Sequence, residues 1–343
     1  MERSVMRRMA PALVLLLALP LTLGAAPRGT EQKPDPKTAP ALPSYVQRVQ
    51  PAVVGIKVQV PRGRPSVLTL GPERWGSGVI FDPAGYALTV SYVLLDAGSI
   101  EVSLRDGRTV PGKLVGLDLE VGLGVVKLDG PGPWPTAVVG DSAGVRVGQA
   151  TATVGVDEDN DLVVTSGSVT EIRGFAGYWE YMLDRAFVVS PYNPAFGGSP
   201  LVNVNGEVIG ITSLRLGERP AVNLAIPIEK FLPGKDELIQ KGRVVSRKPR
   251  PWLGLYTLPV ESGGVVIAGI SPVGPAGRAG FQRGDVIVRV NGEKVLSQEE
   301  FYARLWGTEV GQELTVVVLR GSRFEAITVR PADRYQFFHT TGP

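Results

Sequence analysis

The sequence predicts a mainly β protein in two folded parts, an all-β region followed by a small α+β module. The chain has 343 residues, more than one typical domain, and 43% of them are hydrophobic, enough for real cores. Between residues 44 and 232, short β-rich runs such as "GSGVIFD" and "GYALTVS" alternate with turn signals, and helical periodicity is rare. After residue 250, strands such as "DVIVRVNG" mix with two helical pieces.

Residues 1–26 are predicted to be an export signal peptide. Arg3, Arg7 and Arg8 precede the apolar run "APALVLLLALPLTLGAA", which ends in small residues. The alternative is an uncleaved membrane anchor formed by residues 10–26, because the run approaches spanning length. In either case, we expect the rest of the chain outside the cytoplasm, in a periplasm or secreted.

Charge and residue inventory exclude several classes of function. The net charge is +3, and residues 1–26 contribute three arginines against one glutamate, which leaves about +1 for the rest of the chain. This weak charge argues against a nucleic-acid partner. The chain has no cysteine and one histidine, His339, five residues from the end. We therefore expect no metal site and no cofactor.

The all-β region, residues 44–232, follows a Pro-rich linker at residues 27–43. A short helix with Ser44 as its cap should end before Pro51. Asp106-Gly107 and Asn205-Gly206 are typical of hairpin turns that need a positive φ. The stiff connector "DGPGPWPT", residues 129–136, divides the region into two barrels of similar size.

A helix and a basic linker are expected at residues 233–250, before the module at residues 251–332 and a tail at residues 333–343. In the module, Ser297 and Glu300 form the pattern of a capping box, so a helix should begin there. His339 is most simply a tail residue.

Many ordered phrases resemble the HtrA/DegP family of extracytoplasmic serine proteases. They include "GSGVIFDPAGYALT", "DGRTVPGKLVGLD", "NPAFGGSPLVN" and "SPVGPAGRAGFQRGDVIVRVNGEKV". The resemblance implies a trypsin-like double β-barrel over the first region and a PDZ domain over the module.

Three positions depart from the family's catalytic pattern. Tyr92 in "YALTVSYVL" stands at the place of the histidine base, Gly122 in "GLGVVK" at that of the aspartate, and Gly197 in "NPAFGGSPL" at that of the serine nucleophile. A serine nucleophile needs a neighbouring base held in the right tautomer. We therefore expect that the chain is not an enzyme but a pseudoprotease with vacated triad positions.

Two other segments carry open alternatives. Phe175, Tyr178, Trp179 and Tyr181 lie at the place of the family's regulatory loop and form either a protein-binding patch or a lid over the vacated cleft. The acidic run "VDEDND", residues 156–161, lacks the pattern of a calcium loop and is interpreted as an exposed hairpin tip.

The peptide-binding residues of a PDZ domain are present. Gly254 allows successive amides to converge on a carboxylate, and the following residues should receive the ligand as an added strand. Phe301 or Leu305 would form the floor of an apolar pocket, although Leu253 and Leu305 fit a core role equally well. The expected peptide-binding residues are Trp252, Leu253, Gly254, Leu255, Tyr256, Phe301 and Leu305.

The leading functional hypothesis is an extracytoplasmic protein that binds unfolded segments or C-termini of envelope proteins without cutting them. One alternative is an active serine endopeptidase with a relocated group, such as Ser199 or Ser190 with a lysine base. Another is a PDZ adaptor whose barrels act as a spacer. Family members form trimers through the N-terminal part of the first domain, and Tyr45 is compatible with a homotrimer. A membrane is a partner only if residues 10–26 stay uncleaved.

Overall fold

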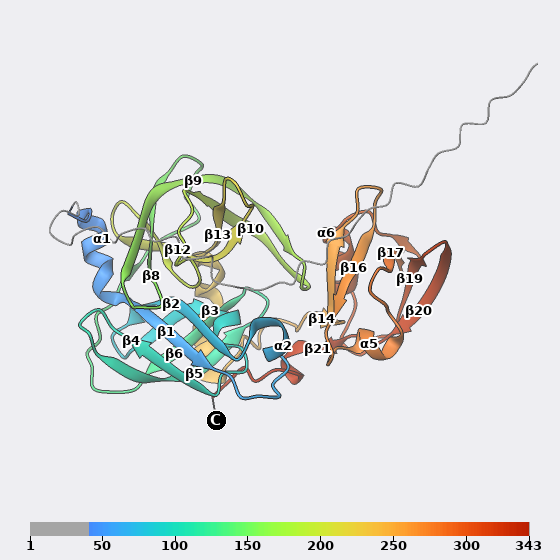
Figure 1. Ribbon diagram of the computed structural model, residues 1–343, viewed down its shortest axis with the longest axis horizontal. Coiled ribbons are helices and arrows are strands. Elements are labelled where there is room, and N and C mark those ends of the chain that lie inside the picture. The colour runs from blue at the N-terminus through green and yellow to red at the C-terminus, as the bar shows by residue number, and fades with distance from the viewer. Residues whose placement is uncertain (1–40, 343) are drawn as a thin grey trace, which may run out of the picture. The chain divides into compact units, whose positions relative to one another are not determined.

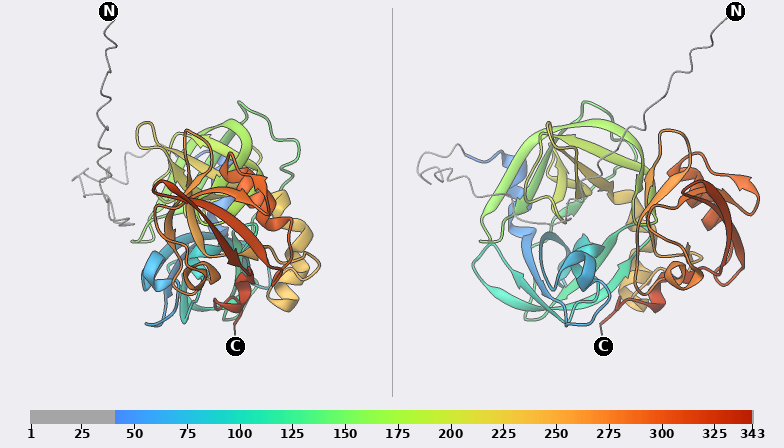
Figure 2. Two further views of the ribbon diagram at one scale, coloured as in Figure 1. Left: turned by 90° about the vertical axis from the view of Figure 1, so that its right-hand side faces the viewer. Right: turned by 45° about the vertical axis from the view of Figure 1, so that its right-hand side comes forward.

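The computed structural model describes residues 41–342, which are drawn in colour in Figures 1 and 2. The predicted export signal, the alternative membrane anchor and residues 27–40 of the predicted linker lie outside this range. Within residues 41–342, no helix has the length and apolar character needed to cross a membrane.

The first half of the β region is a closed barrel with the strand order β1-β2-β3-β6-β5-β4. Its strands are β1 (Val53–Gln59), β2 (Glu73–Asp82), β3 (Tyr86–Val90), β4 (Ser99–Ser103), β5 (Thr109–Asp118) and β6 (Leu123–Leu128). The short helices in this half are α1 (Ser44–Val49), η1 (Gln50–Ala52), α2 (Val67–Leu70) and α3 (Ser91–Leu94). Ser44 is the first helical residue of α1 and not its cap, because Pro43 holds that position with an extended backbone.

The second half is a seven-stranded sheet in the order β11-β8-β9-β10-β13-β12-β7. Because β11 also pairs with β12, the sheet closes into a barrel-like ring. Its strands are β7 (Val138–Val139), β8 (Ala150–Val156), β9 (Leu162–Gly177), β10 (Tyr181–Ser190), β11 (Pro200–Asn203), β12 (Glu207–Leu216) and β13 (Val222–Pro227). The connector at residues 129–136 joins the two sheets where the sequence predicts the division, and the all-β double barrel is confirmed.

Two hairpin turns have the geometry that their sequences require. Gly107, between β4 and β5, has φ +86°, and Gly206, between β11 and β12, has φ +78°. Residues with a side chain rarely adopt these angles. The acidic run at residues 156–161 also lies at a hairpin, between β8 and β9.

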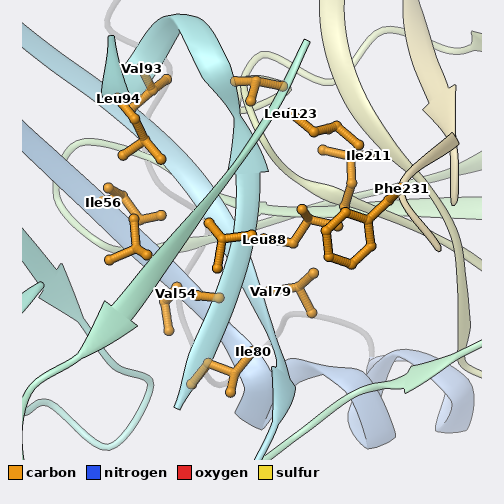
Figure 3. Packing of buried hydrophobic residues seen from close by; sticks show 14 of the residues in the cluster. Val54, Ile56, Val79, Ile80, Leu88, Val93, Leu94, Leu123, Ile211 and Phe231 are labelled. Carbon is orange, nitrogen blue, oxygen red and sulfur yellow. The ribbon is translucent and has the colours of Figure 1, made fainter. Parts of the chain in front are cut away.

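Buried aliphatic side chains of the first barrel form a large core that extends to the second barrel. Figure 3 shows Leu88 of β3 close to Ile211 of β12 and to Phe231, which follows β13. Leu88 and Ile211 are at most 1% exposed. Alternating strand residues that face inward therefore pack the two halves against each other.

The chain then passes through η2 (Ile228–Lys230), η3 (Leu232–Gly234) and α4 (Lys235–Lys241) into an α+β domain. Its main sheet has the order β15-β16-β17-β19-β20, so β15 is an edge strand, and β18 pairs with β17. The strands are β14 (Pro251–Trp252), β15 (Leu255–Pro259), β16 (Val265–Ile270), β17 (Val286–Val290), β18 (Glu293–Lys294), β19 (Leu314–Arg320), β20 (Arg323–Val329) and β21 (Ala332–Asp333). The remaining helices are α5 (Pro275–Ala279), α6 (Gln298–Trp306) and η4 (Arg334–Gln336).

Helix α6 begins where the capping box predicts. The Ser297 hydroxyl accepts a hydrogen bond from the Glu300 N–H at 3.2 Å. The Glu300 carboxylate accepts in turn from the N–H of Leu296 at 2.9 Å. One N–H group of the first turn, that of Glu300, and the N–H of Leu296 before the cap are satisfied in this way.

The residues predicted as a tail lie against the first barrel. The N–H of His339 donates to the carboxylate of Asp96 at 2.6 Å, and the N–H of Asp96 donates to the His339 carbonyl at 3.0 Å. The Tyr335 hydroxyl accepts from the N–H of Leu119 at 2.9 Å. The chain after the α+β domain therefore returns to β-barrel residues distant in sequence.

Truncation of a core side chain tests the importance of this packing. Leu88→Ala should lower the free energy of unfolding by about 2–5 kcal/mol, because it leaves a cavity at a fully buried position. The matched control is Leu68→Ala, whose side chain is 75% exposed and whose loss should cost less than about 0.5 kcal/mol. Chemical denaturation measures both changes, and equal losses would contradict the core assignment.

Candidate functional site

Tyr92 and Gly197 lie next to each other. Tyr92 belongs to α3, directly after β3, and its hydroxyl donates to the Ser213 carbonyl at 2.8 Å. Burial raises the pKa of Tyr92 above its ordinary value, so the phenol stays protonated. A Cβ atom placed on Gly197 would lie 3.0 Å from the Tyr92 hydroxyl oxygen. The phenol therefore occupies the space that a side chain at position 197 would enter.

Gly122 has a corresponding neighbour in Tyr181. Gly122 has φ +87°, and a Cβ atom there would lie 2.9 Å from the Tyr181 hydroxyl oxygen. That hydroxyl donates to the carbonyl of Val121 at 2.6 Å. The N–H of Ser91 donates to the Gly122 carbonyl at 2.9 Å, which places Gly122 beside the residue that precedes Tyr92. The structure thus brings the three expected site positions into one region.

The turn at residues 193–199 is tightly held. Asn193 is fully buried, and its side-chain oxygen accepts from the N–H of Ala195 at 2.8 Å. Gly198 has φ +89°, and a Cβ atom there would lie 2.1 Å from the Ser77 carbonyl oxygen. Its N–H donates to the Thr212 carbonyl at 2.9 Å. Only glycine fits position 198 without displacement of the backbone.

The groups considered for a relocated nucleophile and base are engaged separately. Ser199 is fully buried, and its hydroxyl donates to the Ala195 carbonyl of the same turn. Lys57 pairs with Glu73 at 2.9 Å. The other two lysines of the first barrel bind elsewhere, Lys113 to Asp129 and Lys127 to the Ala84 carbonyl.

The loop that carries Gly122 is fixed by two arginines of the segment before the α+β domain. The buried carboxylate of Asp118 accepts from the N–H groups of Glu120 and Val121 at 3.1 Å each. Arg247 pairs with Asp118 at 3.0 Å, and Arg250 pairs with Glu120 at 3.5 Å. These partners compensate for the burial of the two carboxylates.

The aromatic segment lies at the tip of the β9–β10 hairpin and faces two ways. Tyr181 is 4% exposed and stacks on Trp179 with ring centroids 5.4 Å apart. Tyr178 is 41% exposed and lies 5.9 Å from the ring of Tyr256 in β15. One part of the segment therefore covers Gly122, as a lid would, while another contacts the α+β domain.

Glu180, in the same hairpin, places its carboxylate in the loop before β15. One oxygen accepts from the N–H of Leu253 at 2.9 Å, and the other from the N–H of Leu255 at 2.6 Å. Gly254 between them has φ +83°, which turns the two amides toward one acceptor. Burial raises the pKa of Glu180 to about 7, although these amides and the nearby Arg334 lower it.

Helix α6 presents polar side chains toward the β9–β10 hairpin and β15. The Tyr302 hydroxyl donates to the Gly177 carbonyl at 2.6 Å, and the Gln298 amide donates to the Thr257 carbonyl at 2.7 Å. Phe301 and Leu305, expected at a pocket floor, are fully buried in the core of the α+β domain. Of the other expected residues, Trp252 packs against Phe337 and Phe338.

Sequence reasoning did not single out Glu180, Gln298 or Tyr302. Glu180 was one acidic residue within an aromatic run, and its partners are more than 70 residues away in the chain. Gln298 and Tyr302 are one helical turn apart on α6, and this spacing was the only available signal that they share a face.

The comparisons with known protein families cover both parts of the chain. A model described as a trypsin-like peptidase domain matches residues 76–211, and a PDZ domain model matches residues 247–330. The structure described as the HtrA-type protease AlgW with decapeptide has a TM-score of 0.52 and 27% identity, covering 84% of this chain and 98% of that chain. The serine endoprotease from Yersinia pestis has a TM-score of 0.51 and 26% identity, covering 86% and 99%.

Curated proteins agree with these matches. A probable periplasmic serine endoprotease DegP-like from Halomonas elongata is 34% identical over 274 residues, which cover 75% of this chain and 56% of the relative. The chain thus spans little more than half the length of that relative. Serine endoprotease DegS from Escherichia coli is 30% identical over 347 residues, which cover 94% of each protein.

These relatives contradict the prediction that the chain is not an enzyme. The prediction rested on the residue types at positions 92, 122 and 197, whereas relatives that match across most of the chain are named as serine endoproteases, which points to protease activity. The physical reason is that a serine protease that lacks triad residues still accelerates the reaction roughly 10³–10⁴-fold over the reaction in water. The oxyanion hole and substrate binding provide this residual acceleration. Residue types at three positions therefore do not exclude an enzyme.

A double-mutant cycle tests the contact between positions 92 and 197. Gly197→Ala should lower the free energy of unfolding by about 1 kcal/mol, because its Cβ crowds the Tyr92 hydroxyl. In a Tyr92→Phe background the same change should cost measurably less. Gly144→Ala is the control, because a Cβ there meets open space. Additive effects of the two changes would refute the contact.

The raised pKa of Glu180 predicts a pH-dependent stability. Below about pH 4.5 the side chain is protonated in both the folded and unfolded states. As the pH rises toward the folded-state pKa of about 7, the unfolded state ionises first, so the wild type should lose about 2–3 kcal/mol relative to Glu180→Gln. Denaturant unfolding between pH 4.5 and 8 measures this difference. A difference independent of pH would contradict the burial of the carboxylate, and Glu171→Gln controls for charge loss on the same hairpin.

Proposed function

Because this chain belongs to the HtrA/DegP-like family of trypsin-like peptidases with a C-terminal PDZ domain, we propose that it binds exposed peptide segments and protein C-termini through its PDZ domain. The ligand is a peptide with a free terminal carboxylate and an apolar last residue. The proposed function is peptide binding, whether or not the bound peptide is also cleaved.

The observation that supports the proposal is the loop before β15. The N–H groups of Leu253 and Leu255 both donate to one carboxylate, that of Glu180. A PDZ-type ligand offers the same chemical group at its C-terminus. The loop is therefore suited to a terminal carboxylate, and Trp252, Gly254 and Tyr256 complete the proposed site.

The neighbouring strand supports the same mode of binding. β15 lies at the edge of its sheet, and an edge strand presents unpaired backbone groups that an extended peptide can use. The solved relatives include AlgW structures with a decapeptide and with a tripeptide, which supports peptide binding as a property of this fold.

We also propose that the protein works outside the cytoplasm, where it meets envelope proteins. Support comes from the export signal predicted at residues 1–26 and from the relative named as a probable periplasmic serine endoprotease. Its partners would then be unfolded or damaged chains with accessible ends.

Amidation of the peptide tests the role of the carboxylate. A decapeptide that ends in an apolar residue should bind the full chain with a micromolar Kd, which corresponds to about −8 kcal/mol. The C-terminal amide of the same peptide should lose most of this affinity, because it no longer carries the charge that the amide loop receives. Calorimetry measures both, and the peptide's intact mass after the titration records any cleavage. Equal binding of the acid and the amide would refute the proposed site.

A further inference from the structure

We infer that the tip of the β9–β10 hairpin, residues 177–180, is an internal ligand of the PDZ groove, and that an external peptide C-terminus binds only by displacing it. The inference rests on the proposed function, since it assumes that the groove between β15 and α6 receives peptides. It goes further because it assigns the groove an occupant within the same chain.

The carboxylate of Glu180 occupies the amide donors of the loop before β15. Both oxygens of Glu180 accept from loop amides, those of Leu253 and Leu255. An N–H group has one hydrogen to donate. The loop therefore cannot hold Glu180 and the terminal carboxylate of a peptide at the same time.

The hairpin tip also contacts the backbone of the edge strand β15. The N–H of Thr257, in β15, donates to the carbonyl of Tyr178 at 2.7 Å. This is the backbone contact by which an added strand would pair with an edge strand. The hairpin tip thus uses the pairing site that a bound peptide needs, two residues beyond Leu255.

The hairpin tip also contacts helix α6. The carbonyl of Gly177 accepts from the Tyr302 hydroxyl at 2.6 Å and from the Gln298 amide at 3.4 Å. The N–H of Glu180 donates back to the Tyr302 hydroxyl at 3.1 Å. The hairpin tip therefore contacts the loop, the strand and the helix, which are the three sides of the groove.

Backbone geometry agrees with a segment held by its partners. Glu180 has φ +55°, a conformation that residues with a side chain rarely adopt. Its carbonyl accepts from Arg334 at 3.0 Å. Such a conformation persists where surrounding contacts determine it, so the contacts with the α+β domain hold the tip in place.

An internal ligand lowers the apparent affinity for an external one. The tip is always near the groove, so its effective concentration is high. The apparent Kd of a peptide equals its intrinsic Kd divided by the fraction of molecules with an open groove. Removal of the carboxylate should raise that fraction and tighten peptide binding.

The experiment compares peptide binding by the wild type, Glu180→Ala and Glu171→Ala, each as the full chain, with the free-acid decapeptide that ends in an apolar residue. Glu180→Ala should bind about tenfold tighter or better than the wild type. Glu171→Ala, the same change at an exposed position on β9 that pairs with Arg173, should bind like the wild type.

The outcomes separate this inference from the proposed function. If the wild type binds the peptide and Glu180→Ala binds equally or more weakly, the inference is wrong and the proposed function stands. If only Glu180→Ala binds, the inference is supported. If neither the wild type nor a folded Glu180→Ala binds, both are wrong.

If Glu180→Ala does not fold, hydrogen exchange on the wild type tests whether the peptide displaces the hairpin tip. Hydrogen exchange of the segment at residues 177–182 is followed with and without saturating peptide. Displacement should speed exchange at the Glu180 amide, which loses its acceptor on Tyr302. A peptide that binds while this segment keeps its protection would overturn the inference.

Discussion

A buried carboxylate must be paired with donors, and the side chain of Glu180 meets this constraint by binding two backbone amides of another domain. Those amides belong to the loop that precedes β15, so the constraint links the hairpin of the second barrel to the α+β domain. Tyr302, Gln298 and Thr257 satisfy the polar groups of the neighbouring backbone. The contact of Glu180 with these amides holds the aromatic segment in place, and Tyr181 of that segment covers Gly122.

In the region around positions 92, 122 and 197, tyrosine side chains fill the space beside two glycines. A tyrosine hydroxyl stands close to each of the glycines at 197 and 122, and each hydroxyl donates to a backbone carbonyl, of Ser213 and Val121 respectively. The space beside both glycines is therefore filled by groups that are themselves hydrogen-bonded. Relatives that match most of this chain are named as serine endoproteases.

Ionic contacts reinforce the connection between the domains. Arg247 and Arg250 lie just before the α+β domain and pair with Asp118 and Glu120, which hold the loop of Gly122. The C-terminal residues return to the first barrel through Tyr335 and His339. The segments on both sides of the α+β domain are therefore anchored to the barrel, which limits the number of ways in which the domain can move relative to the hairpin.

Local signals in the sequence determined the double barrel, the α+β domain, the hairpin glycines at 107 and 206 and the cap of α6 at Ser297, because turn geometry and strand alternation act over a few residues. The sequence also placed the amide loop around Gly254. Only the tertiary structure decided what occupies that loop and which residues line its groove. Glu180 meets Leu253 and Leu255, and Tyr302 meets Gly177, across more than 70 residues of chain. Contacts of this range depend on how the β9–β10 hairpin packs against the α+β domain, and no local pattern records them.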